Sequence, residues 1–226
     1  MEITKCTAED LRLINQLSKK ELKAEDVYTF RVACCDNQID RDNECFDDAA
    51  LEEMAKMYVG HTVIKDHDPK TDNQAARIYR AEVESGEKGL KRLVAYAYVP
   101  VLDSTKDFIE SIETGLKKEV SVGCAVKKRI CSVCGEDKGY CSHIPGRSYE
   151  GKSCYRTLSG VKDVYEVSFV AVPSQKNAGV IKNFDIRKSF AVKEQTAEDT
   201  ELEKELLEIE ITNFEKEFDV NGTEMQ

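Results

Sequence analysis

Two strand-like runs bracket a cysteine-rich insert, and this arrangement constrains the fold more than any other feature of the chain. The runs are LKKEVSVGCAV, which begins at Leu116, and VYEVSFVAVP, which ends at Pro173. The insert between them reads CSVCGEDKGYCSHIPGRSYEGKSC. Because apolar and small residues alternate in both runs, we expect two strands of the core, with the insert as a separately stabilised loop.

Length and charge narrow the class of protein. The 226 residues suit one domain of ordinary size with appendages, and the formal net charge of -10 opposes binding to nucleic acid or to anionic membranes. The N-terminus has no basic stretch followed by an apolar run, and no apolar segment approaches the ~18 residues that span a bilayer. We therefore expect a soluble, intracellular protein without a membrane or nucleic-acid partner.

The pattern of apolar residues predicts an α+β fold. Strands are expected over 27–35, 76–83, 93–99, 118–130 and 164–172, and helices over 7–22, 47–60 and 104–115. Many strands with few long helices favour an antiparallel β-barrel or sheet with helices around it.

The chain divides into three predicted parts. An N-terminal helix occupies residues 1–25, the main domain occupies 26–188 with the insert at 130–155, and an acidic linker and tail helix occupy 189–226. The tail places Leu207, Ile211, Phe214 and Phe218 on one stripe. This stripe would pack on its own domain or on a neighbouring copy in a homo-oligomer, or it would serve as an assembly signal.

The cysteine-rich insert has the composition of a zinc site. Nine cysteines are present, an odd number, and five of them lie between Cys124 and Cys154, which favours reduced thiols and metal binding over a disulfide scaffold. CSVCG spaces two thiolates for one ion. We expect the ligands Cys131, Cys134, Cys141 and His143, with Cys154 as the possible replacement for His143. Four protein ligands would make the zinc structural rather than catalytic.

A second group of residues has the composition of a hydrolytic site. Ser121 shares a strand face with Gly123, which leaves room for a substrate backbone. Glu166 lies in an otherwise apolar strand and needs a donor, which a histidine would provide. His67, in KDHDP, is the candidate base, whereas His61 has the pattern of a surface residue and Ser168 competes with Ser121 as the nucleophile.

Several segments resemble the prohead, or capsid maturation, proteases of tailed bacteriophages, whose fold is similar to herpesvirus assemblin. These segments are IDRDNECFD, VIKDHD, ARIYRAEV, IETGLKKEVSVG and YEVSFVAVPSQKNAGV, within about residues 27–182. The resemblance implies that Ser121, His67 and Glu166 form the catalytic set of a serine endopeptidase. Simple members of this family lack a cysteine loop between the serine and acidic strands.

The same resemblance implies partners and a location. The substrates would be the scaffold protein, extensions of the major capsid protein and the protease itself, cleaved inside the immature capsid in the host bacterial cytoplasm. Two other functions stay open from the sequence: a capsid assembly factor without enzymatic activity, and a zinc-ribbon interaction module.

Overall fold

The computed structural model describes residues 6–181, which contain three α-helices, five short 3₁₀-helices and ten strands. The α-helices are α1 (Ala8–Leu17), α2 (Asp48–Met57) and α3 (Lys106–Glu113). The strands are β1 (Val27–Asp36), β2 (Glu44–Phe46), β3 (Thr62–Lys65), β4 (Ala76–Ser85), β5 (Lys91–Pro100), β6 (Val120–Cys131), β7 (Ser148–Tyr149), β8 (Lys152–Ser153), β9 (Arg156–Phe169) and β10 (Gly179–Ile181). The predicted acidic tail helix lies outside the described residues.

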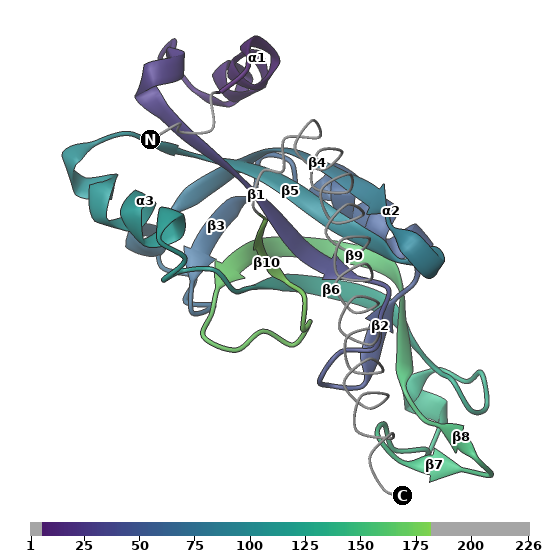
Figure 1. The fold of residues 1–226 in the computed structure, drawn as a ribbon. Helices are drawn as coiled ribbons and strands as arrows, with labels where there is room; N and C mark the ends of the chain where they lie inside the picture. The colour runs from purple at the N-terminus through teal and green to yellow at the C-terminus, as the bar shows by residue number, and fades with distance from the viewer. Residues whose placement is uncertain (1–5, 182–226) are drawn as a thin grey trace, which may run out of the picture. The chain divides into compact units, whose positions relative to one another are not determined.

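Eight of these strands form one sheet in the order β10-β1-β5-β4-β3-β9-β2, with β6 also paired to β9. β9 runs parallel to both β2 and β3 and antiparallel to β6. β6 and β9 lie side by side and extend to the cysteine-rich insert, where β7 and β8 form a small hairpin (Figure 1). The insert thus connects the far ends of two paired strands.

The structure confirms a mixed α+β fold with a large sheet and a cysteine cluster, but it differs from the expected antiparallel barrel. The sheet is mixed, because two of its ladders are parallel. Among the described residues no ladder closes it, since β10 is short and meets the segment before β6 only through a bridge between Glu119 and Gly179.

Helix α2 packs its apolar face on the main core. Its side chains Leu51 and Met54 are fully buried and pack in one cluster with Ile78, Val99 and Val120 of the sheet. Asp47 caps the helix by accepting a hydrogen bond from the Ala50 N–H at 2.7 Å. Burial of this apolar face holds α2 against the sheet.

Helix α1 is shorter than predicted. Thr7 and Asp10 form the capping box at its start, but the helix ends at Leu17 rather than near Leu22. The Asn15 side chain explains the difference, because its amide exchanges two hydrogen bonds with the backbone of Leu22 and folds the chain back. None of the described helices is long and apolar enough to cross a bilayer.

Strand β9 begins earlier than predicted, at Arg156 rather than at Val164. The segment TLSGVKD has too few apolar residues to indicate a strand, yet it pairs with β6 along the way to the insert. Gly160, with a φ of +64°, and two register shifts in the β6–β9 ladder accommodate this irregular part.

Candidate functional site

The β6–β9 ladder places the candidate serine and carboxylate on adjacent strands. Ser121 lies directly opposite Ser168, and Gly123 lies opposite Glu166. In an antiparallel pair, opposite residues have their side chains on the same face of the sheet. Residues more than forty positions apart in sequence therefore meet on one face, as the sequence-based hypothesis requires.

His67 reaches this face from the other side of β9. β3 pairs in parallel with β9, and Ile64 lies opposite Ser168. Directly after β3 the chain turns sharply, with Asp66 at a φ of +56° and His67 at +51°. The Ser168 hydroxyl accepts a hydrogen bond from the His67 N–H at 2.8 Å, which helps to hold this left-handed turn.

His67 and Glu166 are in direct contact. His67 Nδ1 lies 2.9 Å from Glu166 Oε1. The Glu166 side chain is 12% exposed and the His67 side chain 44% exposed, so the carboxylate lies beneath a histidine that solvent can reach. A carboxylate at Nδ1 favours the tautomer with its proton on that nitrogen and leaves Nε2 free to accept a proton.

Gly123 is required for this contact. A Cβ at Gly123 would lie 2.3 Å from Glu166 Oε1, closer than van der Waals packing permits. The carboxylate therefore occupies the space that a side chain at position 123 would fill. The sequence predicts room for a substrate backbone at this glycine, whereas the structure fills the space with Glu166.

Ser121 is half-buried on β6 and lines a cleft together with Val122 and Cys124. Among the described residues, no hydrogen bond partner contacts its hydroxyl, and His67 is not bonded to it. The structure thus joins His67 to Glu166 and places Ser121 on the adjacent strand without a serine–histidine hydrogen bond.

The competing residues have other roles. Ser168 is fully buried, and its hydroxyl is already bonded to the His67 backbone, so it positions the histidine instead of facing a substrate. His61 Nδ1 lies 3.2 Å from the carbonyl oxygen of Tyr165.

Tyr58 contributes to the site although the sequence did not single it out. Its buried hydroxyl donates to the carbonyl oxygens of Gly123 and Glu166 at 3.0 and 3.3 Å. The sequence could not indicate these hydrogen bonds, because a tyrosine on the apolar face of a predicted helix is expected to pack in the core.

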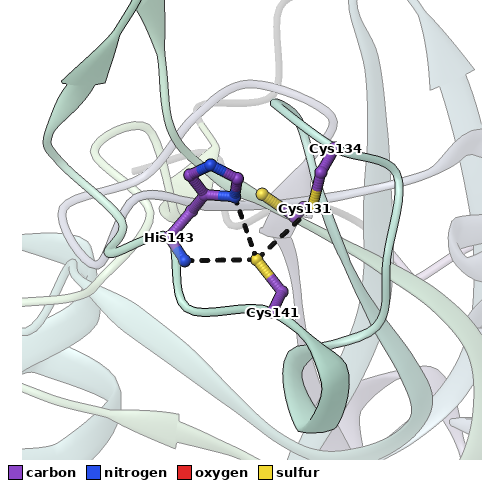
Figure 2. A group of neighbouring side chains, drawn as sticks. All are labelled: Cys131, Cys134, Cys141 and His143. Atoms are coloured by element: carbon purple, nitrogen blue, oxygen red, sulfur yellow. Dashed lines mark hydrogen bonds between the residues drawn. The ribbon is translucent and has the colours of Figure 1, made fainter.

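The cysteine-rich insert brings four potential metal ligands together. The ligand atoms of Cys131, Cys134, Cys141 and His143 all lie within 4.8 Å of one another, and their side chains converge in Figure 2. The Sγ atoms of Cys134 and Cys141 are 3.4 Å apart, and Cys141 Sγ is 3.3 Å from His143 Nδ1. With Zn–S bonds of about 2.3 Å, sulfurs on a tetrahedral ion are about 3.8 Å apart, so this group could hold a metal ion such as zinc.

Cys154 lies next to this group but outside it. Its Sγ is 3.9 Å from Cys131 Sγ, and its side chain is buried. The four mutually close atoms include His143 and exclude Cys154, in agreement with the first of the two ligand sets that the sequence leaves open.

The surroundings of two of the thiols, Cys131 and Cys141, lower their pKa values and so favour the ionised, metal-binding form, whereas the pKa of Cys134 is raised. Burial opposes ionisation of Cys131, but the N–H groups of Cys134 and Val133 and the neighbouring thiols lower its pKa to about 6. Arg156 is nearly fully buried beside the group and donates to the His143 carbonyl oxygen at 2.6 Å. Its guanidinium helps to lower the pKa of Cys141 against the opposing effect of burial. The sequence does not indicate that Arg156 is buried beside the cysteines, because arginine residues are usually exposed.

Comparisons with protein-family models, with curated proteins and with solved structures find no match to this chain.

The contact between Gly123 and Glu166 predicts the effect of a single methyl group. In Gly123→Ala the carboxylate must move off His67, so the free energy of unfolding should fall by about 1–3 kcal/mol. The hydrogen-bonded Nδ1–H signal of His67 should disappear from ¹H–¹⁵N spectra of the histidine rings. Gly139→Ala is the matched control, since a Cβ there meets nothing within 4 Å. An unchanged His67 signal in Gly123→Ala would contradict the geometry described here.

Proposed function

We propose that this protein is a serine endopeptidase that acts in the maturation of a phage prohead. The observation that carries the proposal is the pair formed by His67 and Glu166, 2.9 Å apart, next to the strand that holds Ser121. A carboxylate that orients a solvent-accessible imidazole beside a serine is the arrangement of a Ser-His-acid hydrolase.

In this mechanism each of the three side chains has one role. His67 Nε2 takes the proton of Ser121 as the hydroxyl oxygen attacks a peptide carbonyl carbon, and Glu166 holds the ring and stabilises its charged form. The imidazolium then gives this proton to the departing amine, which leaves an acyl-enzyme on Ser121. Water, deprotonated by His67, releases the acyl group and restores the serine.

The serine–histidine hydrogen bond, not formed in this structure, belongs to the substrate-bound state in this proposal. Catalytic hydrogen bonds are often long or misaligned in free enzymes and shorten when substrate binds. The Ser121 hydroxyl makes no hydrogen bond among the described residues, so rotation about the Cα–Cβ bond of Ser121 breaks none.

The assignment to prohead maturation is supported by the sequence segments that resemble that protease family. Those segments include the turn with His67 and the two strands with Ser121 and Glu166. An assemblin-like fold, cleavage of scaffold and capsid-protein extensions, self-cleavage and location inside the immature capsid are parts of this proposal.

A capsid assembly factor without enzymatic activity is the second candidate. The lack of a bond between Ser121 and His67 favours it, because a binding protein does not need that contact. The two candidates differ in whether Ser121 is needed for cleavage.

Cleavage by the full-length protein tests this difference. The protein would be coexpressed with the major capsid protein proposed as its substrate, and the products would be identified by intact-mass spectrometry. Ser121→Ala should slow cleavage by about four to six orders of magnitude, because no other group replaces the nucleophile. Ser104→Ala, at an exposed position, should cleave like the wild type. If Ser121→Ala cleaves at the wild-type rate, Ser121 is not the nucleophile.

We further propose that the insert binds one structural zinc ion through Cys131, Cys134, Cys141 and His143. This proposal is supported by the four ligand atoms, which all lie within 4.8 Å of one another. Four protein ligands would occupy every position around a tetrahedral zinc ion. Such an ion would fold a loop that has almost no apolar core.

Elemental analysis tests the zinc proposal. Protein purified without chelator should contain about one zinc per chain, and Cys134→Ser should contain less than about half an equivalent because one ligand is lost. Cys6→Ser, outside the cluster, should retain the wild-type content. Equal zinc in the two variants would exclude this ligand set.

A further inference from the structure

Arg156, the first residue of β9, is buried where this strand leaves the cysteine-rich insert. The residue is only 4% exposed. Arginine is almost never buried to this extent without an anion that offsets its charge, because an uncompensated charge away from water is costly. The groups around Arg156 therefore indicate what kind of anion this position suits.

No carboxylate has this role among the described residues. None of the ion pairs within residues 6–181 includes Arg156, and its Nη1 is buried without a hydrogen-bond partner. Glu44 lies opposite Arg156 in the β2–β9 ladder, but its ion pair is with Arg129, at 3.6 Å. The guanidinium thus keeps its positive charge and an unused donor.

The cysteine cluster of Figure 2 lies next to this guanidinium. Cys131 is directly opposite Arg156 in the β6–β9 ladder, so the two side chains leave the sheet on the same face. Arg156 Nη2 donates to the His143 carbonyl oxygen at 2.6 Å, and the His143 N–H donates to Cys141 Sγ at 3.3 Å. Arg156 is therefore connected to three of the four predicted metal ligands.

The backbone of Arg156 is held on both sides. Its N–H donates to the Asn43 carbonyl oxygen at 2.9 Å, next to β2, and on the other side it pairs with Cys131 of β6. The guanidinium thus extends from a fixed point of the sheet toward the insert. Groups outside the ligand set that hold the ligands in this way tune the affinity of a metal site.

Formal charges indicate what the guanidinium balances. Cys131, Cys134 and Cys141 bind a metal as thiolates, and His143 binds as a neutral imidazole. With Zn²⁺ these ligands leave one net negative charge, which one guanidinium cancels. If Cys154 replaced His143, a fourth thiolate would leave two negative charges, and a single arginine would cancel only one of them.

We propose that Arg156 is part of the metal site: its guanidinium is the counter-charge of the three metal-bound thiolates, and its unused N–H group is a donor for their sulfurs. The inference rests on the proposed zinc site and extends it in two respects. The occupied site is electrically neutral with a divalent ion, and His143 rather than Cys154 is the fourth ligand.

The zinc affinity of the full-length protein tests the role of Arg156. Dissociation constants would be measured by competition with a chromophoric chelator. Arg156→Met keeps the length of the side chain but loses its charge and donors, so zinc should bind about 10–100-fold more weakly. Arg156→Lys, which retains the charge without the planar set of donors, should recover part of this loss.

Arg147→Met is the matched control, since Arg147 is an exposed arginine of the same insert. This variant should bind zinc like the wild type. Equal zinc affinity of the wild type and Arg156→Met would overturn the inference. An equal loss of affinity in the two methionine variants would also overturn it, because any positive charge of the insert would then have the same effect.

Cobalt(II) absorption tests the charge count without a change at Arg156. Co²⁺ binds the same types of ligand as Zn²⁺, and its sulfur-to-metal charge-transfer absorption increases with the number of bound thiolates. The wild type and Cys154→Ser should both give the intensity of three thiolates per bound ion. An intensity of four thiolates in the wild type, or a decrease in Cys154→Ser, would overturn the assignment of His143.

The same spectra distinguish a lost counter-charge from a lost ligand. Arg156→Met should retain the intensity of three thiolates per bound cobalt although it binds the ion more weakly. Fewer thiolates in this variant would contradict the role of a counter-charge. If the wild type binds neither zinc nor cobalt, the zinc proposal itself fails. If the wild type binds both ions and Arg156→Met binds them equally well, only the role of Arg156 fails.

Discussion

The pairing of β6 with β9 is the constraint on which the rest of the structure depends. This ladder sets Ser121 opposite Ser168 and Gly123 opposite Glu166, and its far end holds the cysteine cluster. A slip of one residue would turn Ser121 to the opposite face and move Gly123 away from Glu166. The bonds of Tyr58 to the carbonyl oxygens of Gly123 and Glu166 join the two strands at this point and fix them to α2.

The turn after β3 is the second constraint. Asp66 and His67 are consecutive residues other than glycine, and both have a positive φ. This backbone conformation costs roughly 1–2 kcal/mol per residue and persists because neighbouring groups hold the turn. The Asp66 N–H donates to the Phe169 carbonyl oxygen at 2.8 Å, and the His67 N–H donates to Ser168. β9 therefore positions the histidine twice, through its backbone and through the Glu166 carboxylate. Strain of this kind is typical of functional sites.

The sequence predicts the presence of the helices, the long strands and the cysteine cluster, because each is a local pattern. Caps and apolar spacing mark α2, and the cysteine spacing marks the cluster that the structure forms. The open, mixed sheet was not predicted, since parallel pairing of β9 with β2 and β3 depends on partners distant in sequence. The sequence also predicted that Glu166 would need a histidine as its donor, and the structure brings His67 to it. It carried no sign of the contact between Gly123 and Glu166, which arises only when the two strands pair.

Labelling by a fluorophosphonate tests the central claim, that His67 and Glu166 activate Ser121, most directly. The full-length protein would be treated with the reagent, digested and mapped by mass spectrometry, with His67→Ala as the comparison. The account predicts an adduct on Ser121 in the wild type that His67→Ala does not form, because an unactivated serine hydroxyl reacts very slowly. An adduct on a different serine, or equal labelling of Ser121 in both proteins, would contradict it.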